Sequence, residues 1–63
     1  MRLSEFWKRM EARFGATYAR SLAADYRVGS LGATVNDAIE RGESPQAVWR
    51  AVCQEFEVPQ RLR

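Results

Sequence analysis

A chain of 63 residues, 46% of them hydrophobic, fits one small globular domain rather than a disordered tail. One cysteine excludes an internal disulfide, and the absence of histidine removes the commonest general base and the commonest metal ligand. The formal net charge is +2, with a basic segment before Gly32 and a slightly acidic one from there onward.

The first helix is predicted over residues 4–14. Ser4 is a good capping residue and Glu5 lies favourably in the first turn. Gly15 follows the last apolar residue, where a left-handed C-terminal cap is usual. The apolar residues recur at helical spacing and form one stripe: Leu3, Phe6, Trp7, Met10 and Phe14.

The second helix is predicted over residues 17–28, with small alanines that let another helix approach closely. The residues of its inner face are Tyr18, Ala19, Leu22, Ala23 and Tyr26. The stretch Val28–Ala33 carries two glycines and a serine, which is typical of a loop. No segment alternates with a period of two over the length of a strand, so no strand is expected.

The third helix is short and predicted over residues 35–41, between Thr34 as its cap and Gly42 as its end. Asp37 stands three residues after Thr34, at the spacing of a capping box. The residues expected to point inward are Val35, Ala38 and Ile39.

The fourth helix, over residues 45–56, has the sharpest predicted start in the chain. Ser44 is a good cap, and Pro45 occupies the first helical position, where its missing N–H costs nothing. The inner stripe consists of Val48, Trp49, Val52, Cys53 and Phe56. Pro59 prevents continuation, and residues 59–63 are predicted to form a frayed tail.

Together these elements predict an all-α fold, a compact bundle of four short helices in one domain over residues 1–63. The first two helices are expected to pack as a hairpin, and the last two to close the core. In so small a protein, Trp7 and Trp49 are expected to supply core mass. Cys53 has no histidine partner and is expected to be buried and unreactive.

A surface formed by the first two helices is one candidate for binding. Its arginines could contact an acidic protein or a phosphate backbone, or form only a solvated face. Glu5, four residues before one of them, neutralises part of their charge. The candidate residues are Arg2, Arg9 and Arg13 on one flank of the first helix, with Arg20 and Arg27 on the outer side of the second.

A helix-turn-helix over residues 34–56 is the alternative, because a DNA-reading motif joins two helices by a short turn, often with glycine. Its outward residues would be Gln46, Arg50 and Gln54. That helix offers one outward cation with Glu55 close by, whereas DNA affinity depends on neutralised phosphates. The motif would also prefer Ala51 inside, where the apolar stripe does not place it. Nucleic acid is therefore not the favoured partner.

A resemblance to a known family is carried by the stretches MRLSEFWKRM, YARSLA, TVNDAIERG and VWRAVCQEFEVP. Together they resemble small actinobacterial proteins classed as a domain of unknown function, over nearly the whole chain. Members are commonly encoded near the RecA recombinase, which implies a role in DNA repair or recombination but no binding residue. Many relatives have a histidine near Tyr26 and a Gly-Gly-Arg run before the threonine matching Thr34, where this chain has LGAT.

These observations favour a non-enzymatic, cytoplasmic interaction module with an unidentified protein partner, linked to DNA repair or recombination. A core this small buries only about 60% of the unfolded surface, so an enzyme cleft would be costly. No apolar run approaches the roughly 20 residues that span a bilayer, and no signal peptide is evident, so no membrane association is expected. No metal-ligand spacing or phosphate loop points to a cofactor. A homodimer through an exposed tryptophan edge stays open.

Overall fold

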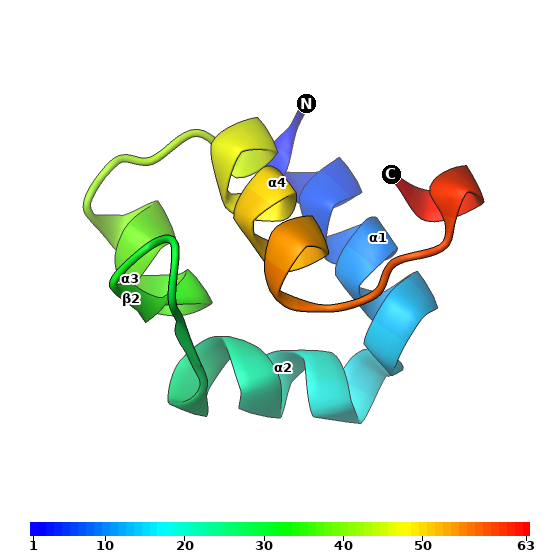
Figure 1. The fold of residues 1–63 in the computed structure, drawn as a ribbon, viewed down its shortest axis with the longest axis horizontal. Coiled ribbons are helices and arrows are strands. Elements are labelled where there is room, and N and C mark those ends of the chain that lie inside the picture. The colour runs from blue at the N-terminus through cyan, green and yellow to red at the C-terminus, as the bar shows by residue number, and fades with distance from the viewer.

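The computed structural model describes residues 1–63 and contains four α-helices, a minimal hairpin and a short C-terminal turn. The elements in chain order are α1 (Leu3–Phe14), α2 (Ala16–Asp25), β1 (Arg27–Val28), β2 (Ala33–Thr34), α3 (Val35–Glu40), α4 (Pro45–Glu55) and the 3-10 turn η1 (Gln60–Leu62). In Figure 1, α2 runs along the bottom of the molecule, α1 and α4 stand above it, and α3 lies on the far side of α4 from the C-terminus. The predicted all-α fold with four short helices is confirmed.

The start of α1 differs from the prediction. The helix begins at Leu3, where the N–H of Phe6 donates to the carbonyl of Arg2 at 3.0 Å, and no side chain caps it. Ser4 therefore lies inside the first turn, and its predicted role as the cap is wrong. The free N–H groups of this exposed first turn can be satisfied by water, so a side-chain cap is not required.

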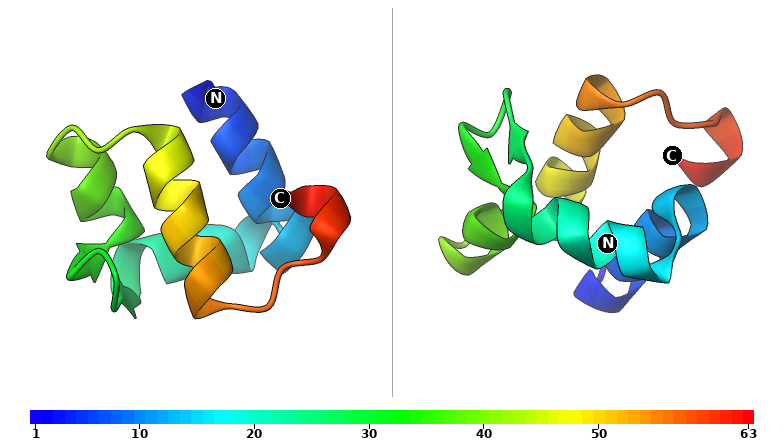
Figure 2. Two further views of the ribbon diagram at one scale, coloured as in Figure 1. Left: turned by 45° about the horizontal axis from the view of Figure 1, so that its top comes forward. Right: turned by 90° about the horizontal axis from the view of Figure 1, so that it is seen from below.

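A single residue, Gly15, separates α1 from α2. Its φ of 87° and ψ of 153° belong to a region that is almost restricted to glycine. Its N–H donates to the carbonyl of Glu11 at 2.8 Å, and its own carbonyl accepts from the N–H of Ala19 at 2.9 Å. The glycine therefore ends one helix and starts the next, but without the expected left-handed cap, and the two helices meet at a corner (Figures 1 and 2).

The second helix ends three residues earlier than predicted. After Asp25 the chain becomes extended, and β1 pairs antiparallel with β2 in the register Arg27 to Thr34 and Val28 to Ala33. This conformation buries the side chain of Val28 completely. The expectation of no strand is thus wrong, because two-residue strands are too short to leave an alternating pattern in the sequence.

The predicted starts of α3 and α4 are confirmed. The Thr34 hydroxyl oxygen accepts from the N–H of Asp37 at 3.2 Å, and the Ser44 hydroxyl oxygen accepts from the N–H of Ala47 at 3.1 Å. Between the two helices Gly42 has a φ of 99°, a conformation that side chains rarely adopt. These caps depend on local contacts, which is why the residue types alone could predict them.

The core lies where the inner faces of the four helices meet. Phe6 is fully buried and packs edge-on against Trp7 and Trp49, at centroid distances of 5.2 and 6.1 Å. Trp49 is 3% exposed, whereas Trp7 is only partly buried. Three residues expected inside are exposed, namely Leu3, Tyr18 and Tyr26. Ala51, which was expected outside, is buried.

The C-terminal tail, predicted to be frayed, folds back against α1 through η1. Val58 is 5% exposed, and Leu62 packs against the core. The Nε of Arg63 donates to the carbonyl of Val58 at 3.2 Å. Figure 2 shows this segment returning to α1 after leaving the end of α4. Burial of Val58 and Leu62 orders the tail, a tertiary effect that helix-stop signals do not show.

None of the helices combines the length and the apolar character that a membrane-spanning segment requires.

Candidate basic interface

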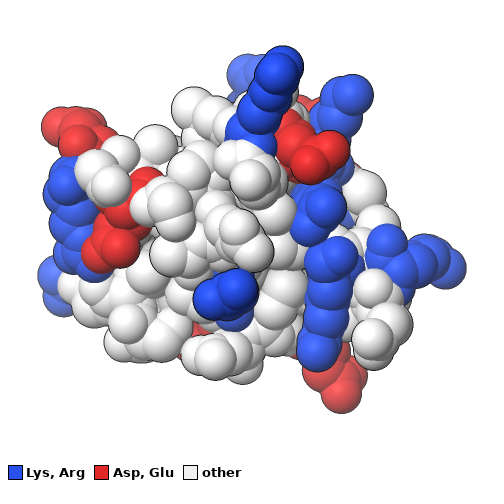
Figure 3. Space-filling model, turned by 90° about the horizontal axis from the view of Figure 1, so that it is seen from above, with Lys and Arg blue, Asp and Glu red and all other residues white.

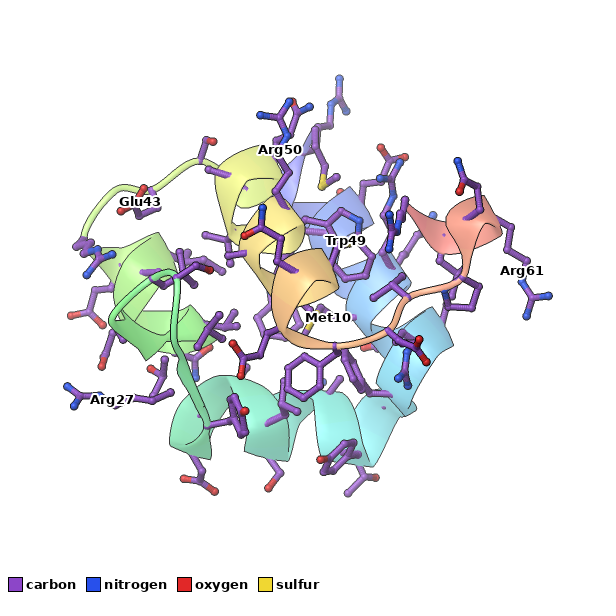
Figure 4. All side chains as sticks on the ribbon, in the orientation of Figure 1. Met10, Arg27, Glu43, Trp49, Arg50 and Arg61 are labelled. Carbon is purple, nitrogen blue, oxygen red and sulfur yellow. The ribbon has the colours of Figure 1, made fainter.

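The arginines that the sequence groups on the first two helices do not form one surface. Arg2 lies near Glu5 and Lys8 at the start of α1. Arg20 lies on another face beside Trp7. Arg27 belongs to β1 rather than to α2, and its side chain points away from α1 in Figure 4. The remaining two, Arg9 and Arg13, lie toward α4 and the C-terminal segment.

Arg13 has a structural role. Its Nε donates to the carbonyl of Glu57 at 2.7 Å, and its guanidinium carbon lies 4.7 Å from the ring centroid of Phe14. These contacts help to fasten the segment after α4 onto the end of α1. The contacts use its Nε and one face of its guanidinium group and leave the two terminal nitrogens free.

The residues of the helix-turn-helix alternative do come together. Gln46, Arg50 and Gln54 lie four residues apart on the exposed face of α4 and line one shallow pocket of about 430 Å³. Arg9 enters this pocket from α1, and Arg63 enters it from the C-terminal segment. We call this the Trp49 pocket, after the indole that lies between α4 and α1 (Figure 4). Its full lining is Met1, Arg9, Gln46, Trp49, Arg50, Cys53, Gln54 and Arg63.

The Trp49 pocket is positively charged, because its lining contains three arginines and no acidic residue. Figure 3 shows most of the visible Lys and Arg over the half of the molecule that holds α1 and the C-terminus, with a few acidic side chains among them. The acids near α4 are engaged elsewhere. Glu55 accepts from the Tyr26 hydroxyl at 2.6 Å and from the N–H of Gly29 at 3.3 Å, and Glu43 pairs with Arg41 at 3.0 Å.

The guanidinium groups of the pocket keep much of their hydrogen-bonding capacity. The two ion pairs of the structure join Arg9 to Glu5 and Arg41 to Glu43, so Arg50 has no acidic partner. The Arg9 pair is long, at 3.9 Å, and its Glu5 side is exposed to solvent, which makes it weak. Arg63 uses only its Nε, in the bond to Val58, so its two terminal nitrogens remain free to donate.

Two further groups of the pocket have unusual environments. The buried Nε1 of Trp49 has no hydrogen-bond partner, an arrangement that costs about 1–3 kcal/mol. Burial raises the pKa of the Cys53 thiol above its usual value, and the charges of Arg63 and Arg9 oppose that rise. The sequence did not point to Arg63, because the tail was predicted to be frayed, and it placed Trp49 in the core, with an exposed tryptophan edge considered only as a homodimer contact.

The family model described as Protein of unknown function (DUF3046) matches residues 1–61 of the chain. The chain belongs to this family. The match confirms the resemblance to a domain of unknown function, and it covers every residue of the Trp49 pocket except Arg63. No curated protein and no solved structure matches the DUF3046 chain. Nowhere in the fold do three His, Cys, Asp or Glu side chains lie close enough together to hold a metal ion.

Proposed function

We propose that this DUF3046 protein is a non-enzymatic module that binds an acidic segment of a partner protein at the Trp49 pocket. One observation carries the proposal: Arg9, Arg50 and Arg63 come from three separate elements and line one pocket whose lining contains no acidic residue. Like charges gathered in this way repel one another, and an anionic partner relieves that repulsion. Guanidinium groups also suit planar, bidentate recognition of carboxylates.

The size of the molecule agrees with a binding role. A standard protein interface covers about 800 Å² on each partner, which is roughly a fifth of the 4178 Å² that this chain exposes. One face of the molecule can therefore hold a partner while the others stay free. The resemblance to proteins encoded near the RecA recombinase supports a cytoplasmic partner in DNA repair or recombination.

A fluorescent peptide of ten glutamates, titrated at low and at physiological salt, tests this proposal. We expect binding that weakens with salt and is lost in the double variant Arg9→Glu with Arg50→Glu. The matched control is Arg20→Glu with Arg27→Glu, which changes the net charge equally on other faces. If both double variants lose peptide binding equally, net charge alone accounts for the binding. If the native chain does not bind the peptide, the proposal is wrong.

Nucleic-acid binding by α3 and α4 is a second candidate, favoured by two observations. Ala51 is 7% exposed, so the packing that a DNA-reading motif prefers at this position is present after all. Arg and Gln, the side chains that recognise guanine and adenine, occupy the exposed face of α4. Acidic residues on both sides of the Trp49 pocket count against contact with a long phosphate backbone. Glu5 lines the neighbouring pocket at Met1, and Glu57 lines the neighbouring pockets at Arg63.

Labelled double- and single-stranded DNA, titrated at the same two salt concentrations, separate the two candidates. A steep salt slope with tight binding would favour nucleic acid, and Arg50→Ala would then weaken it more than Arg9→Ala. Light scattering on the same samples shows whether two copies of the chain pair instead.

A further inference from the structure

The Trp49 pocket holds more hydrogen-bond donors than a carboxylate can accept. Arg9 and Arg50 line it without a strong ion-pair partner, and Arg63, also in the lining, has two terminal nitrogens free to donate. The amides of Gln46 and Gln54 lie on the same lining. A carboxylate offers two oxygens and one negative charge, so it would leave most of these donors and much of the positive charge unmatched.

The buried N–H of Trp49 is a second, independent observation. It is the one buried side-chain nitrogen or oxygen in the structure without a hydrogen-bond partner. The residue that carries it also lines the pocket and is 3% exposed. Buried polar groups are nearly always satisfied, so this donor is open to an acceptor that enters the pocket and displaces the side chains covering the indole.

From these donors we infer that the Trp49 pocket binds a phosphate monoester, carried by a phosphorylated side chain of the partner protein. A phosphate monoester has about two negative charges at neutral pH and three strong acceptor oxygens, which match three arginines and an N–H. The charge distribution favours one such group over a nucleic-acid backbone, since Glu5 and Glu57 interrupt the positive surface on both sides. The inference rests on the proposed function and names the chemistry of the partner.

The two indole N–H signals in a proton–nitrogen NMR spectrum provide the test, with Trp7 as an internal control on another face. The probes are two capped peptides, with either one phosphoserine or one glutamate between glycines, at matched ionic strength. We expect the phosphoserine peptide to bind about tenfold more tightly and to shift the Trp49 signal while the Trp7 signal stays in place.

Variants locate the binding. Arg9→Gln with Arg50→Gln should weaken phosphoserine binding by about tenfold or more, whereas Arg20→Gln with Arg27→Gln should leave it unchanged. Trp49→Phe removes the N–H and keeps an aromatic ring, and it should weaken binding several-fold. Because that change also alters the core, the variant of Arg9 and Arg50 decides the question if the Trp49 variant does not fold.

Each other result has a distinct meaning. Binding of the ten-glutamate peptide without any preference for phosphoserine would overturn this inference and leave the proposed function in place. Binding of neither probe would overturn both. A phosphoserine peptide that binds without moving the Trp49 signal would place the site elsewhere, and tighter binding of a short single-stranded DNA would favour the nucleic-acid candidate instead.

Discussion

The two faces of α4 differ in how their polar groups are used. On the side of the β-hairpin, Glu55 accepts hydrogen bonds from Tyr26 and Gly29, and every one of these groups has a partner within the chain. On the side of α1, Arg50 has no acidic partner and the N–H of Trp49 has no partner at all. The first face connects α4 to the rest of the fold, and the second is the one that we propose binds a partner.

The largest effect should come from the packing beneath the pocket. Phe6 is fully buried between Trp7 and Trp49, so Phe6→Ala leaves a cavity and should reduce the free energy of unfolding by about 3–5 kcal/mol. The total free energy of unfolding of a chain of this length is roughly 3–9 kcal/mol, so this variant should be close to unfolding or unfolded. Urea denaturation followed by tryptophan fluorescence measures the loss. Leu3→Ala, at an exposed position of the same helix, is the control and should change little.

A smaller effect should separate the two faces. Glu55→Ala removes the hydrogen bonds from Tyr26 and from Gly29 of the hairpin turn, and it should lower the temperature of unfolding by less than Phe6→Ala does. Binding of the ten-glutamate peptide should persist, because Glu55 does not line the Trp49 pocket. Calorimetry and the peptide titration are the two measurements. Glu40→Ala is the control, because it also removes one exposed carboxylate. Equal loss of binding and stability would contradict the division between the faces.

High pH should weaken the contact between Tyr26 and Glu55. The hydrogen bond to Glu55 raises the pKa of Tyr26 above its usual value of 10.0. Because the folded-state pKa is the higher one, the bond contributes fully below about pH 10 and its contribution is lost as the pH rises through the folded-state pKa. Between about pH 9 and pH 11, the temperature of unfolding should fall more steeply for the native chain than for Tyr26→Phe. Tyr18→Phe, which removes an exposed phenol, should behave like the native chain.

The smallest effect concerns Cys53, which lines the Trp49 pocket. Since burial raises the pKa of its thiol, the folded chain should react with iodoacetamide more slowly at mildly alkaline pH than the chain unfolded in urea. Addition of the phosphoserine peptide should slow the reaction further, because the ligand would cover the sulfur. Mass spectrometry of the alkylated fraction over time measures both rates. An unchanged rate with the peptide bound would show that the ligand lies away from Cys53.

Local features of the fold were predictable from the sequence. Thr34 and Ser44 were recognised as caps because each contacts an N–H three residues away, and Pro45 is tolerated at the first helical position for an equally local reason. The burial of Phe6 and Val48 followed from helical spacing, which links residues only one or two turns apart. For these features, neighbouring residue types were sufficient.

The tertiary structure decided the rest. Val28 leaves the helix because its burial in the core outweighs the continuation of α2, and Leu62 orders the tail for a similar reason. The Trp49 pocket joins Arg9 to Arg50 and to Arg63, residues far apart along the chain, so no spacing in the sequence could group them. The residue types by themselves determined that the protein is small and helical and that its first half is basic. Which charges meet, and which donors stay unpaired, depended on how distant segments pack against one another.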